Sequence, residues 1–512
     1  MSKNPVPIVA IVGRTNVGKS SLFNALIGRR EAIVADEPGT TRDSITAKAT
    51  LESDKDFWLV DTAGLKDAAD AFELTIQDQI EEAANSADVI LVTVDGTTML
   101  TAEDRRVAKI AFKSGKKLIL IVNKGDKAKK SQIEAYRKLG ISPLIATSAT
   151  QRKGIFEIEE ALDEAIPAAS INEADDRIRI ALLGRPNVGK SSLYNAMAKK
   201  QQAIVADRAG TTRDVNRTLI KYKKREIELL DTAGIRRSGR IEKGVEQFSV
   251  LRSLSAIEQS DICMLLVDAN ELSVALDQKI AGMVKEAGKG LIIVISKWDM
   301  INAVTPDATD DETDADEPDR PEAVETAEEA EEKAKDKVKK RIVTLHDRTS
   351  RSIKSDFIFV PWAPLIFTSS VDGKNVTKLF DLALEIMERR AQKVTTRQLN
   401  VWLKKVTDRH PPAGLKNRQP KLRYMVQEDN PIPAFKIFGS QTKFLHWSYK
   451  RHMDRMIRME WDYTGTPVQM WFIDRDVEKQ RDEKFGGRKF KNNGNRDKQR
   501  KRQSEPKPPR TD

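Results

Sequence analysis

One eight-residue pattern occurs twice in this chain of 512 residues and limits how the chain can fold. Residues 13–20 read GRTNVGKS and residues 184–191 read GRPNVGKS. Other segments recur at nearly the same spacing: GTTRD at 39–43 and 210–214, DTAG at 61–64 and 231–234, and NKGD at 123–126, which SKWD matches at 296–299. Because the whole set repeats in the same order, the sequence predicts two domains of one architecture.

Apolar runs between these motifs predict the architecture of each copy. In the first copy they predict strands near residues 6–12, 45–51, 57–61, 88–94, 117–122 and 142–146, with helical segments between most of them. Near-continuous apolar runs are typical of strands that are covered on both faces. The alternation indicates the α/β class, with a mostly parallel sheet flanked by helices. We assign residues 1–167 to the first domain, 168–176 to a linker and 177–391 to the second domain.

The second copy differs from the first by an insertion. The chain between Asp299 and Ser369 is much longer than the matching part of the first copy, between Asp126 and Ser148. Most of the extra residues fall in the stretch 305–332, and residues 307–332 carry fourteen Asp or Glu against one Arg. This composition favours a disordered, solvated spacer. The alternative is an acidic arm that shields a basic surface from the wrong RNAs.

Residues 392–474 predict a small third domain of the α+β type. An amphipathic helix precedes strands near 421–427 and 434–438, a basic helix near 444–458 and a strand near 467–473. The basic helix is either a solvated face or a contact for an RNA backbone. Residues 475–512 predict a disordered basic tail, since residues 477–512 carry thirteen Lys or Arg against six Asp or Glu. The basic excess indicates a polyanionic partner, with nucleic acid favoured over a membrane.

Bulk properties exclude other classes of protein. A single cysteine, Cys263, excludes an internal disulfide and suits a reducing cytosol. No apolar run reaches the roughly 18 residues that a membrane-spanning helix needs. The first residues lack the apolar core of a secretory signal. We therefore expect a cytoplasmic protein with no membrane partner, and a monomer.

The repeated GR-x-NVGKS segments fit G-x-x-x-x-G-K-[ST], the phosphate-binding loop. Its backbone N–H groups surround nucleotide phosphates, and its lysine, Lys19 or Lys190, places a positive charge on the β- and γ-phosphates. Ser20 and Ser191 offer a hydroxyl to Mg²⁺. The residues expected at the phosphates are Gly13, Arg14, Thr15, Asn16, Val17, Gly18, Lys19, Ser20 and Ser21 in the first copy, and Gly184, Arg185, Pro186, Asn187, Val188, Gly189, Lys190, Ser191 and Ser192 in the second.

Two further motifs in each copy predict a sensor of the terminal phosphate. Asp61 and Asp231 end apolar strands, where a carboxylate can hold Mg²⁺ through water. Gly64 and Gly234 each place a backbone N–H at the γ-phosphate, so loss of that phosphate would release the following loop. Thr62 and Ala63, and likewise Thr232 and Ala233, complete these segments. One hydroxyl of each threonine pair, 40–41 and 211–212, should bind Mg²⁺ when the γ-phosphate is present.

The Lys-x-Asp segments predict which base is bound. Asp126 or Asp299 can accept two hydrogen bonds from the N1–H and N2–H₂ groups of guanine, a donor pair that adenine lacks. The stems of Lys124 and Lys297 pack along the base. Asn123 in the first copy is replaced by the shorter Ser296, so the second site is expected to hold guanine more loosely. Backbone donors complete the two pockets at Ser148 and Ala149, and at Ser369 and Ser370.

These motifs resemble those of the Der, or EngA, family of bacterial tandem GTPases that act in ribosome assembly. The resemblance covers about residues 1–475 and includes Thr396-Arg-Gln-Leu-Asn, Pro433-Ala-Phe and Tyr463-Thr-Gly-Thr-Pro in the third domain. It implies that the third domain is KH-like. It also implies that GTP hydrolysis is coupled to maturation of the large (50S) ribosomal subunit, with the subunit and its rRNA as partners. By the same resemblance, Thr41 and Thr212 are the Mg²⁺ ligands of the threonine pairs. Ser296 and Ser370 depart from the usual Asn and Ala.

Catalysis must differ from that of Ras-like proteins, because Leu65 and Ile235 stand where those proteins have a water-positioning Gln. One reading is poor hydrolysis, which would make the protein a nucleotide-regulated RNA-binding scaffold with little turnover. The other resembles potassium-activated GTPases, in which Asn16 and Asn187 bind K⁺ and the ion neutralises charge developing between the β- and γ-phosphates. Asn is also common in turns for conformational reasons. The catalytic candidates are Asn16, Lys19, Thr41, Asn187, Lys190 and Thr212.

Overall fold

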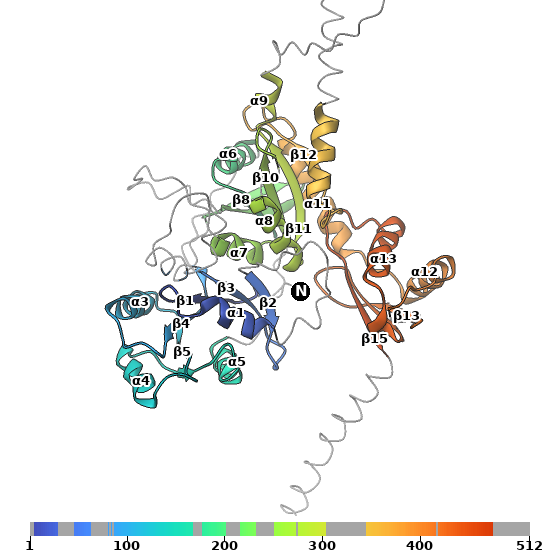
Figure 1. Ribbon diagram of the computed structural model, residues 1–512. Helices are drawn as coiled ribbons and strands as arrows, with labels where there is room; N and C mark the ends of the chain where they lie inside the picture. The colour runs from blue at the N-terminus through green and yellow to red at the C-terminus, as the bar shows by residue number, and fades with distance from the viewer. Residues whose placement is uncertain are drawn as a thin grey trace, which may run out of the picture. The chain divides into compact units, whose positions relative to one another are not determined.

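The computed structural model describes residues 5–28, 46–62, 80, 83, 86–166, 177–200, 216–231, 250–272, 275–303, 345–415 and 418–474. The chain divides into two compact units. The first comprises Met1–Arg389 with Thr464–Pro467, and the second comprises Arg390–Tyr463 with the chain from Val468 on. The first unit contains two six-stranded sheets and the second a three-stranded sheet (Figure 1).

The first sheet has the strand order β2-β3-β1-β4-β5-β6, and all neighbours are parallel except β2 and β3. The predicted strands are confirmed, with small shifts at their ends. The elements are β1 (Ile8–Val12), α1 (Lys19–Ile27), β2 (Thr46–Thr50), β3 (Asp56–Asp61), β4 (Val89–Asp95), α3 (Ala102–Lys113), β5 (Lys117–Asn123), α4 (Lys130–Ala135), the 3₁₀ helix η2 (Tyr136–Leu139), β6 (Leu144–Ala146) and α5 (Ile155–Ala165).

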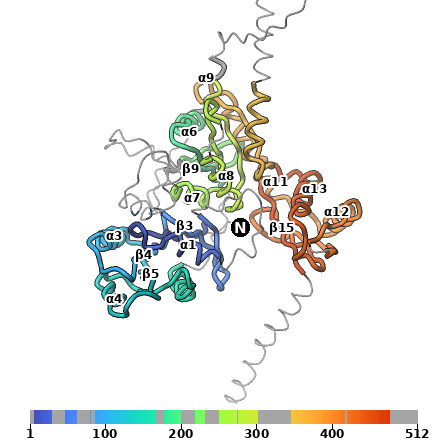
Figure 2. The backbone as a smooth tube through the Cα atoms, in the orientation of Figure 1, coloured from blue at the N-terminus to red at the C-terminus, as the bar shows by residue number. Residues whose placement is uncertain are grey.

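Strand β1 shows why both faces of this sheet are covered. All five of its residues are buried, and alternate side chains point to opposite faces. Val9 and Ile11 pack with apolar residues of α1 and α5, whereas Ala10 and Val12 pack with those of α3. In Figure 2, α3 and α4 lie on the same side of β4 and β5. The apolar residues of α5 pack on the opposite face of the sheet, with those of α1.

The second sheet repeats this plan, with the order β12-β11-β10-β7-β9-β8 and an antiparallel pair formed by β8 and β9. Helices α6 and α11 pack on one face, and α7 and α8 on the other. The elements are β7 (Ile178–Leu183), α6 (Lys190–Lys200), β8 (Asn216–Tyr222), β9 (Arg225–Asp231), α7 (Val250–Gln259), β10 (Ile262–Asp268), α8 (Ala275–Glu286), β11 (Gly290–Ser296), α9 (Trp298–Ala303), β12 (Leu365–Phe367) and α11 (Val376–Ala391). Cys263 is buried in β10, and its Sγ lies 3.2 Å from Ser260 Oγ.

The second unit is a small α+β fold. Its sheet has the order β13-β14-β15, antiparallel and then parallel. Leu399 and Trp402 of α12 and Met453 of α13 pack with Phe435 and Ile437 on one face of this sheet. The elements are α12 (Thr396–Arg409), β13 (Lys421–Gln427), β14 (Ala434–Ser440), the 3₁₀ helix η3 (Thr442–Phe444), α13 (Trp447–Glu460) and β15 (Gln469–Asp474). The α/β class of the two copies and the α+β class of the third domain are thereby confirmed.

Three predicted segments lie outside the described residues: the linker 168–176, the acidic stretch 305–332 and the tail 475–512. Their predicted disorder therefore stays a prediction, as do the domain boundaries assigned from the sequence. Among the helices that the structure describes, none is both long and apolar enough to span a bilayer.

Candidate functional site

Both candidate sites lie at the carboxyl ends of the parallel strands, where ligands bind in open α/β sheets. In the first domain, Gly13 follows β1 directly, Asp61 ends β3, and Ser148 and Ala149 follow β6. The register of β4 and β5 places Asp95 opposite Asn123. In the second domain, the register of β10 and β11 places Asp268 opposite Ser296. Strand pairing thus gathers motifs that are far apart in the sequence.

The phosphate loops have the backbone shape that the motif predicts. Gly13 has φ +156° and Gly184 has φ +139°, and a Cβ on either would lie only 2.2 Å from Thr93 O or 2.7 Å from Leu266 O. Only glycine fits such contacts with neighbouring backbone. Asn16 and Asn187 both have φ 62°, a left-handed conformation that asparagine tolerates better than most residues. The two copies therefore fold alike at this loop.

Each loop surrounds its own lysine. Lys19 Nζ donates to Gly13 O and Arg14 O, both at 2.8 Å. Lys190 Nζ donates to Gly184 O at 3.1 Å and to Arg185 O at 2.6 Å. The two lysines are 5% and 8% exposed. Each is the first residue of its helix, α1 or α6, so the ammonium and the positive end of the helix dipole lie together.

Oxygen ligands suited to Mg²⁺ converge beside the first loop. Ser20 Oγ donates to Asp61 Oδ2 at 2.6 Å. Magnesium prefers few protein oxygens together with waters and phosphate oxygens, and this pair fits that preference. In the second domain Asp231 occupies the matching place, opposite Leu182 as Asp61 is opposite Ile11. The remaining predicted switch residues, Thr41, Ala63, Gly64, Thr212, Thr232, Ala233 and Gly234, lie outside the described residues.

In the first domain, the base-recognition segment is bonded to the phosphate loop. Asn123 Nδ2 donates to Val17 O at 2.9 Å, and its Oδ1 accepts from the Ala149 N–H at 3.2 Å. Lys124 Nζ donates to Asn16 O at 2.9 Å. Asp126 is exposed, and its Oδ2 accepts from Gln151 Nε2 at 3.1 Å. One asparagine thus joins the phosphate loop to the loop that follows β6.

The second domain has fewer of these bonds. Ser296 Oγ donates to Val188 O at 2.6 Å and to Val267 O at 3.2 Å. Among the residues that the structure describes, no hydrogen bond joins Ser296 to Ser370. A Cβ on Gly18 would lie 2.4 Å from Asn123 Nδ2, but one on Gly189 would lie 4.0 Å from Ser296 Cβ. Ser296 therefore keeps a hydrogen bond to the phosphate loop but leaves space beside Gly189, and its side chain does not bond the described loop after β12.

Exchanging these two residues is expected to exchange the affinities of the sites. Asn123→Ser should weaken GDP binding at the first site roughly tenfold, because it removes one or two hydrogen bonds worth about 1 kcal/mol each. Ser296→Asn should tighten the second site by a similar factor. Release of a fluorescent GDP analogue, with the other site disabled by Lys190→Ala or Lys19→Ala, measures each site alone. Unchanged release from both variants would contradict this role.

Two acidic residues at strand ends were missed by the motif analysis. Lys124 Nζ donates to Asp95 Oδ2, and Lys297 Nζ to Asp268 Oδ2, both at 2.6 Å. Burial raises the pKa of each carboxyl, but the hydrogen bonds that each accepts outweigh it, so both pKa values lie below the ordinary value. Each aspartate therefore holds the lysine that is predicted to pack along the base. The sequence did contain a signal for these two residues. Each aspartate ends an apolar run, and the two occur at corresponding positions of the two copies.

The loop arginines also bind protein groups. Arg14 Nε lies 3.2 Å from Asp104 Oδ1, and Arg185 Nε lies 3.1 Å from Asp277 Oδ2, with both aspartate side chains fully buried. Asp104 also caps α3, because its Oδ2 accepts from the Thr101 N–H at 3.0 Å. The guanidinium of each arginine thus forms an ion pair with an aspartate of the adjacent helix. The backbone carbonyl of each arginine accepts a hydrogen bond from the loop lysine.

The helix η2 is bonded to the same site. Tyr136 Oη donates to Asp95 O at 2.7 Å and to Thr98 O at 3.0 Å. Thr98 Oγ1 in turn accepts from Arg14 at 2.6 Å. Helices α3 and η2 are therefore both connected to groups that contact the first phosphate loop or Lys124. No sequence pattern indicates this connection, since Tyr136 belongs to no repeated motif.

Two protein-family models match the chain. One, described as a 50S ribosome-binding GTPase, matches residues 8–124 and 179–297. The other, described as the KH-domain-like domain of EngA bacterial GTPase enzymes, matches residues 393–472. The third domain is therefore KH-like, as the resemblance implied.

Curated relatives match nearly the whole chain. GTPase Der of Chloroflexus aggregans is 39% identical over 488 residues, which cover 93% of this chain and 100% of the relative. GTPase Der of Herpetosiphon aurantiacus is 38% identical, covering 92% and 97%, and that of Thermomicrobium roseum is 36% identical, covering 92% and 97%. Two GTPase domains in such a chain imply binding of GTP, GDP and Mg²⁺ and hydrolysis of GTP. The chain belongs to the Der family of GTPases.

Proposed function

We propose that this GTPase acts in assembly of the large (50S) ribosomal subunit, and that the nucleotides at its two sites control its domain arrangement and its binding to the subunit and its rRNA. The observation that carries the proposal is the presence of two complete phosphate loops, each surrounding its lysine, in a chain with a KH-like third domain. The description of the matching GTPase model as ribosome-binding supports the partner. We place the protein in the cytoplasm as a monomer.

Sedimentation with purified ribosomal subunits tests this function. The chain is expected to pellet with the large subunit to different extents in GTP, in GDP and in a non-hydrolysable GTP analogue. The matched control is the Lys19→Ala, Lys190→Ala double variant, whose pelleting should no longer depend on nucleotide. Equal pelleting of the wild-type chain under all three nucleotides would contradict nucleotide control, and no pelleting with either subunit would contradict the role itself.

The surface of α13 supports an RNA partner. Trp447 is 40% exposed, and the Arg451 guanidinium lies 4.8 Å from the centroid of its ring. Flat aromatic and guanidinium groups stack on bases, and basic side chains bind phosphates. Lys450 lies on the same helix, 5.8 Å from the Phe472 ring centroid. No G-x-x-G clamp is evident in the sequence of this unit, so its RNA contacts would differ from those of a standard KH domain.

The residues of each site have distinct parts in hydrolysis. Lys19 and Lys190 hold the β- and γ-phosphates and offset the charge that develops there. Ser20 and Asp61, and by the same motif Ser191 and Asp231, would hold Mg²⁺, which neutralises phosphate charge when bound. Thr41 and Thr212 would add a hydroxyl ligand in the GTP state. Leu65 and Ile235 cannot orient water, so alignment of the attacking water depends on other groups.

We further propose that Asn16 and Asn187 bind K⁺ through their side-chain oxygens. Both residues have φ 62°, and asparagine also suits these positions because it tolerates the left-handed backbone. The test must therefore separate K⁺ binding from this conformational role. Asn16→Gly keeps the left-handed backbone accessible and removes the amide. We expect wild-type hydrolysis to be at least about tenfold faster in KCl than in NaCl, because removing one charge-stabilising group lowers the rate of such reactions by about tenfold or more. We expect Asn16→Gly to lose this difference at the first site.

Steady-state phosphate release in a Lys190→Ala background measures the first site alone. Asn16→Asp is the matched variant, since it keeps an oxygen at the same place and should retain cation dependence. Equal rates in KCl and NaCl for the unsubstituted loop, or an unchanged ratio in Asn16→Gly, would remove the K⁺ role and leave only the conformational one.

A further inference from the structure

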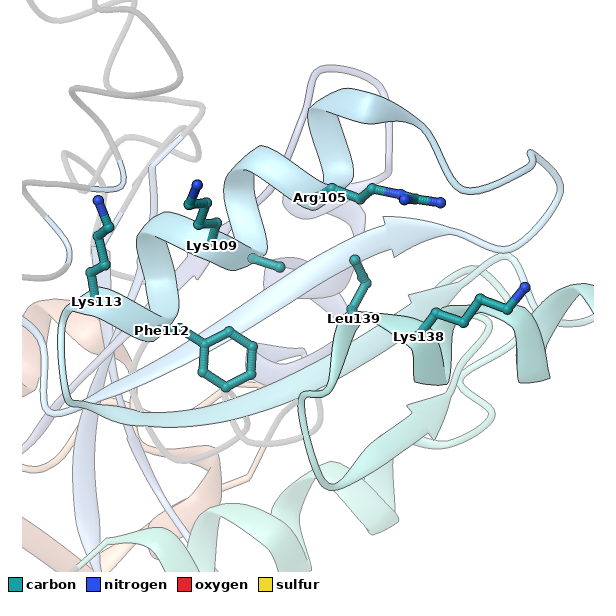
Figure 3. A pocket seen from close by; sticks show the side chains of 7 residues that line it. Arg105, Lys109, Phe112, Lys113, Lys138 and Leu139 are labelled. Carbon is teal, nitrogen blue, oxygen red and sulfur yellow. The ribbon is translucent and has the colours of Figure 1, made fainter.

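We propose that the surface between α3 and η2 of the first GTPase domain is a binding site for single-stranded RNA. This surface, the α3–η2 pocket, is an open depression with a volume of about 370 Å³. It is lined by Arg105, Lys109, Phe112, Lys113, Lys138 and Leu139 (Figure 3). The proposal rests on the ribosomal role proposed above, and it assigns an RNA contact outside the KH-like domain and the basic tail.

Positive charge follows one face of α3. Arg105, Lys109 and Lys113 recur every four residues and are exposed, which spaces them about 6 Å apart along the helix. Lys138 adds a fourth cation from η2. Among the residues that the structure describes, none of these four forms an ion pair. A row of unpaired cations of this kind suits successive phosphates of a polyanion.

An aromatic ring lines the same pocket as these cations. Phe112 is 49% exposed, although an aromatic side chain of this size normally buries most of its surface. In Figure 3, Phe112 and Leu139 lie on the two sides of the space between α3 and η2, and the basic side chains extend outward from it. The volume of the depression is at the lower end of the size range of ligand pockets. Basic groups around an exposed ring are the combination that binds backbone and base of a single strand together.

The chain's own acidic segment is a poorer occupant of this pocket. Residues 305–332 supply negative charge but contain no aromatic residue, and Val324 is their only large aliphatic side chain. Such a segment would pair with the lysines and leave the Phe112 ring in contact with water. Single-stranded RNA supplies one phosphate and one flat base at every nucleotide, so it can satisfy both features.

Helix α8 of the second GTPase domain corresponds to α3 and lacks this combination. The two helices can be aligned on their buried aspartates, Asp104 and Asp277. The three cations of α3 then correspond to Gln278, Gly282 and Glu286 of α8, and Phe112 corresponds to Lys285. The pocket is therefore not a general feature of this domain type, and α8 provides an internal comparison.

Crosslinking of the full-length chain to a short single-stranded RNA that contains 4-thiouridine tests the proposal. Mass spectrometry should locate crosslinks in the peptides of α3 and η2, apart from those of the basic tail. Lys109→Ala with Lys113→Ala is expected to lower the α3 and η2 crosslinks roughly tenfold, and to reduce the slope of log affinity against log salt by about 1.4 for two lost phosphate contacts. Phe112→Leu keeps an apolar side chain and should lower these crosslinks at least about fivefold without changing the slope.

The control is Lys354→Ala with Lys378→Ala, which removes the same charge from exposed helical positions elsewhere in the first unit. This variant should crosslink at α3 and η2 as the wild type does, and GTP hydrolysis by all variants shows that they are folded. Crosslinks confined to other regions, or an equal effect of the control, would overturn the proposal. A further contrary result would be that an acidic peptide with aromatic residues binds this pocket in a way that depends on Phe112, whereas RNA binding does not depend on Phe112. Loss of nucleotide-dependent pelleting with intact crosslinking would instead refute only the ribosomal role.

Discussion

Lys19→Ala is expected to reduce GTP turnover at the first site by a factor of roughly 100 to 1,000, while the second site stays active. The lysine is 5% exposed, and two loop carbonyls 2.8 Å away orient its ammonium. Removing a preorganised donor that stabilises developing charge typically costs a factor of this size. The substitution also leaves Gly13 O and Arg14 O without their shared donor, so the empty loop should lose its shape as well.

Single-turnover hydrolysis of radiolabelled GTP, measured for Lys19→Ala, Lys190→Ala and the double variant, separates the two sites. Each single variant should lose one kinetic component, and the double variant should lose both. Lys199→Ala is the matched control, because Lys199 is exposed on the same helix, α6, that begins at Lys190. Near wild-type turnover by the double variant would show that the phosphate loops are not where hydrolysis occurs.

Asp126→Asn is expected to weaken GTP binding at the first site by roughly 100-fold to 10,000-fold. The carboxylate accepts two hydrogen bonds from guanine, and charge-assisted bonds are worth about 1.5–3 kcal/mol each. An amide cannot accept both bonds. It can donate to the carbonyl that xanthine has in place of the guanine amino group, so affinity for XTP should rise. In the structure the carboxylate is exposed and accepts one hydrogen bond from Gln151 Nε2 at 3.1 Å, so it is accessible to a base.

Equilibrium titration with GTP, XTP and ATP, in a chain whose second site is disabled by Lys190→Ala, measures this change. Asp299→Asn should give the same change at the second site when Lys19→Ala disables the first. Asp408→Asn removes an exposed carboxylate of α12 and should have no effect. Retention of GTP preference by Asp126→Asn would mean that other groups recognise the base.

The sequence predicted the elements and the motifs well because both depend on short-range patterns. Strands such as β4 and β5 are apolar runs ended by polar residues, and the phosphate loop needs glycine at positions where a Cβ would meet Thr93 O or Leu266 O. A local pattern carries that information. The replacement of Asn123 by the shorter Ser296 can likewise be read directly from one motif position, and the weaker guanine binding expected from it stays a prediction.

The partners of individual side chains could not be predicted in this way. Arg14 belongs to the phosphate-loop motif, but no motif indicates that its guanidinium pairs with Asp104, which lies on a different element and far away in the sequence. Tyr136 is bonded to Asp95 O only because the sheet places η2 beside the end of β4. Such pairings depend on how elements pack, and no periodicity or motif encodes them.

The Asp104 carboxylate, which bonds both the start of α3 and the phosphate-loop arginine, has a thermodynamic consequence for the first domain. Suppose that an occupant of the α3–η2 pocket binds more tightly when the first site holds GTP than when it holds GDP. The occupant must then raise the affinity of that site for GTP relative to GDP by the same factor, because coupling between two sites on one molecule is reciprocal. The equivalent helix α8 has neither the three cations nor the ring at the corresponding positions. This coupling therefore involves the nucleotide at the first site and not the nucleotide at the second.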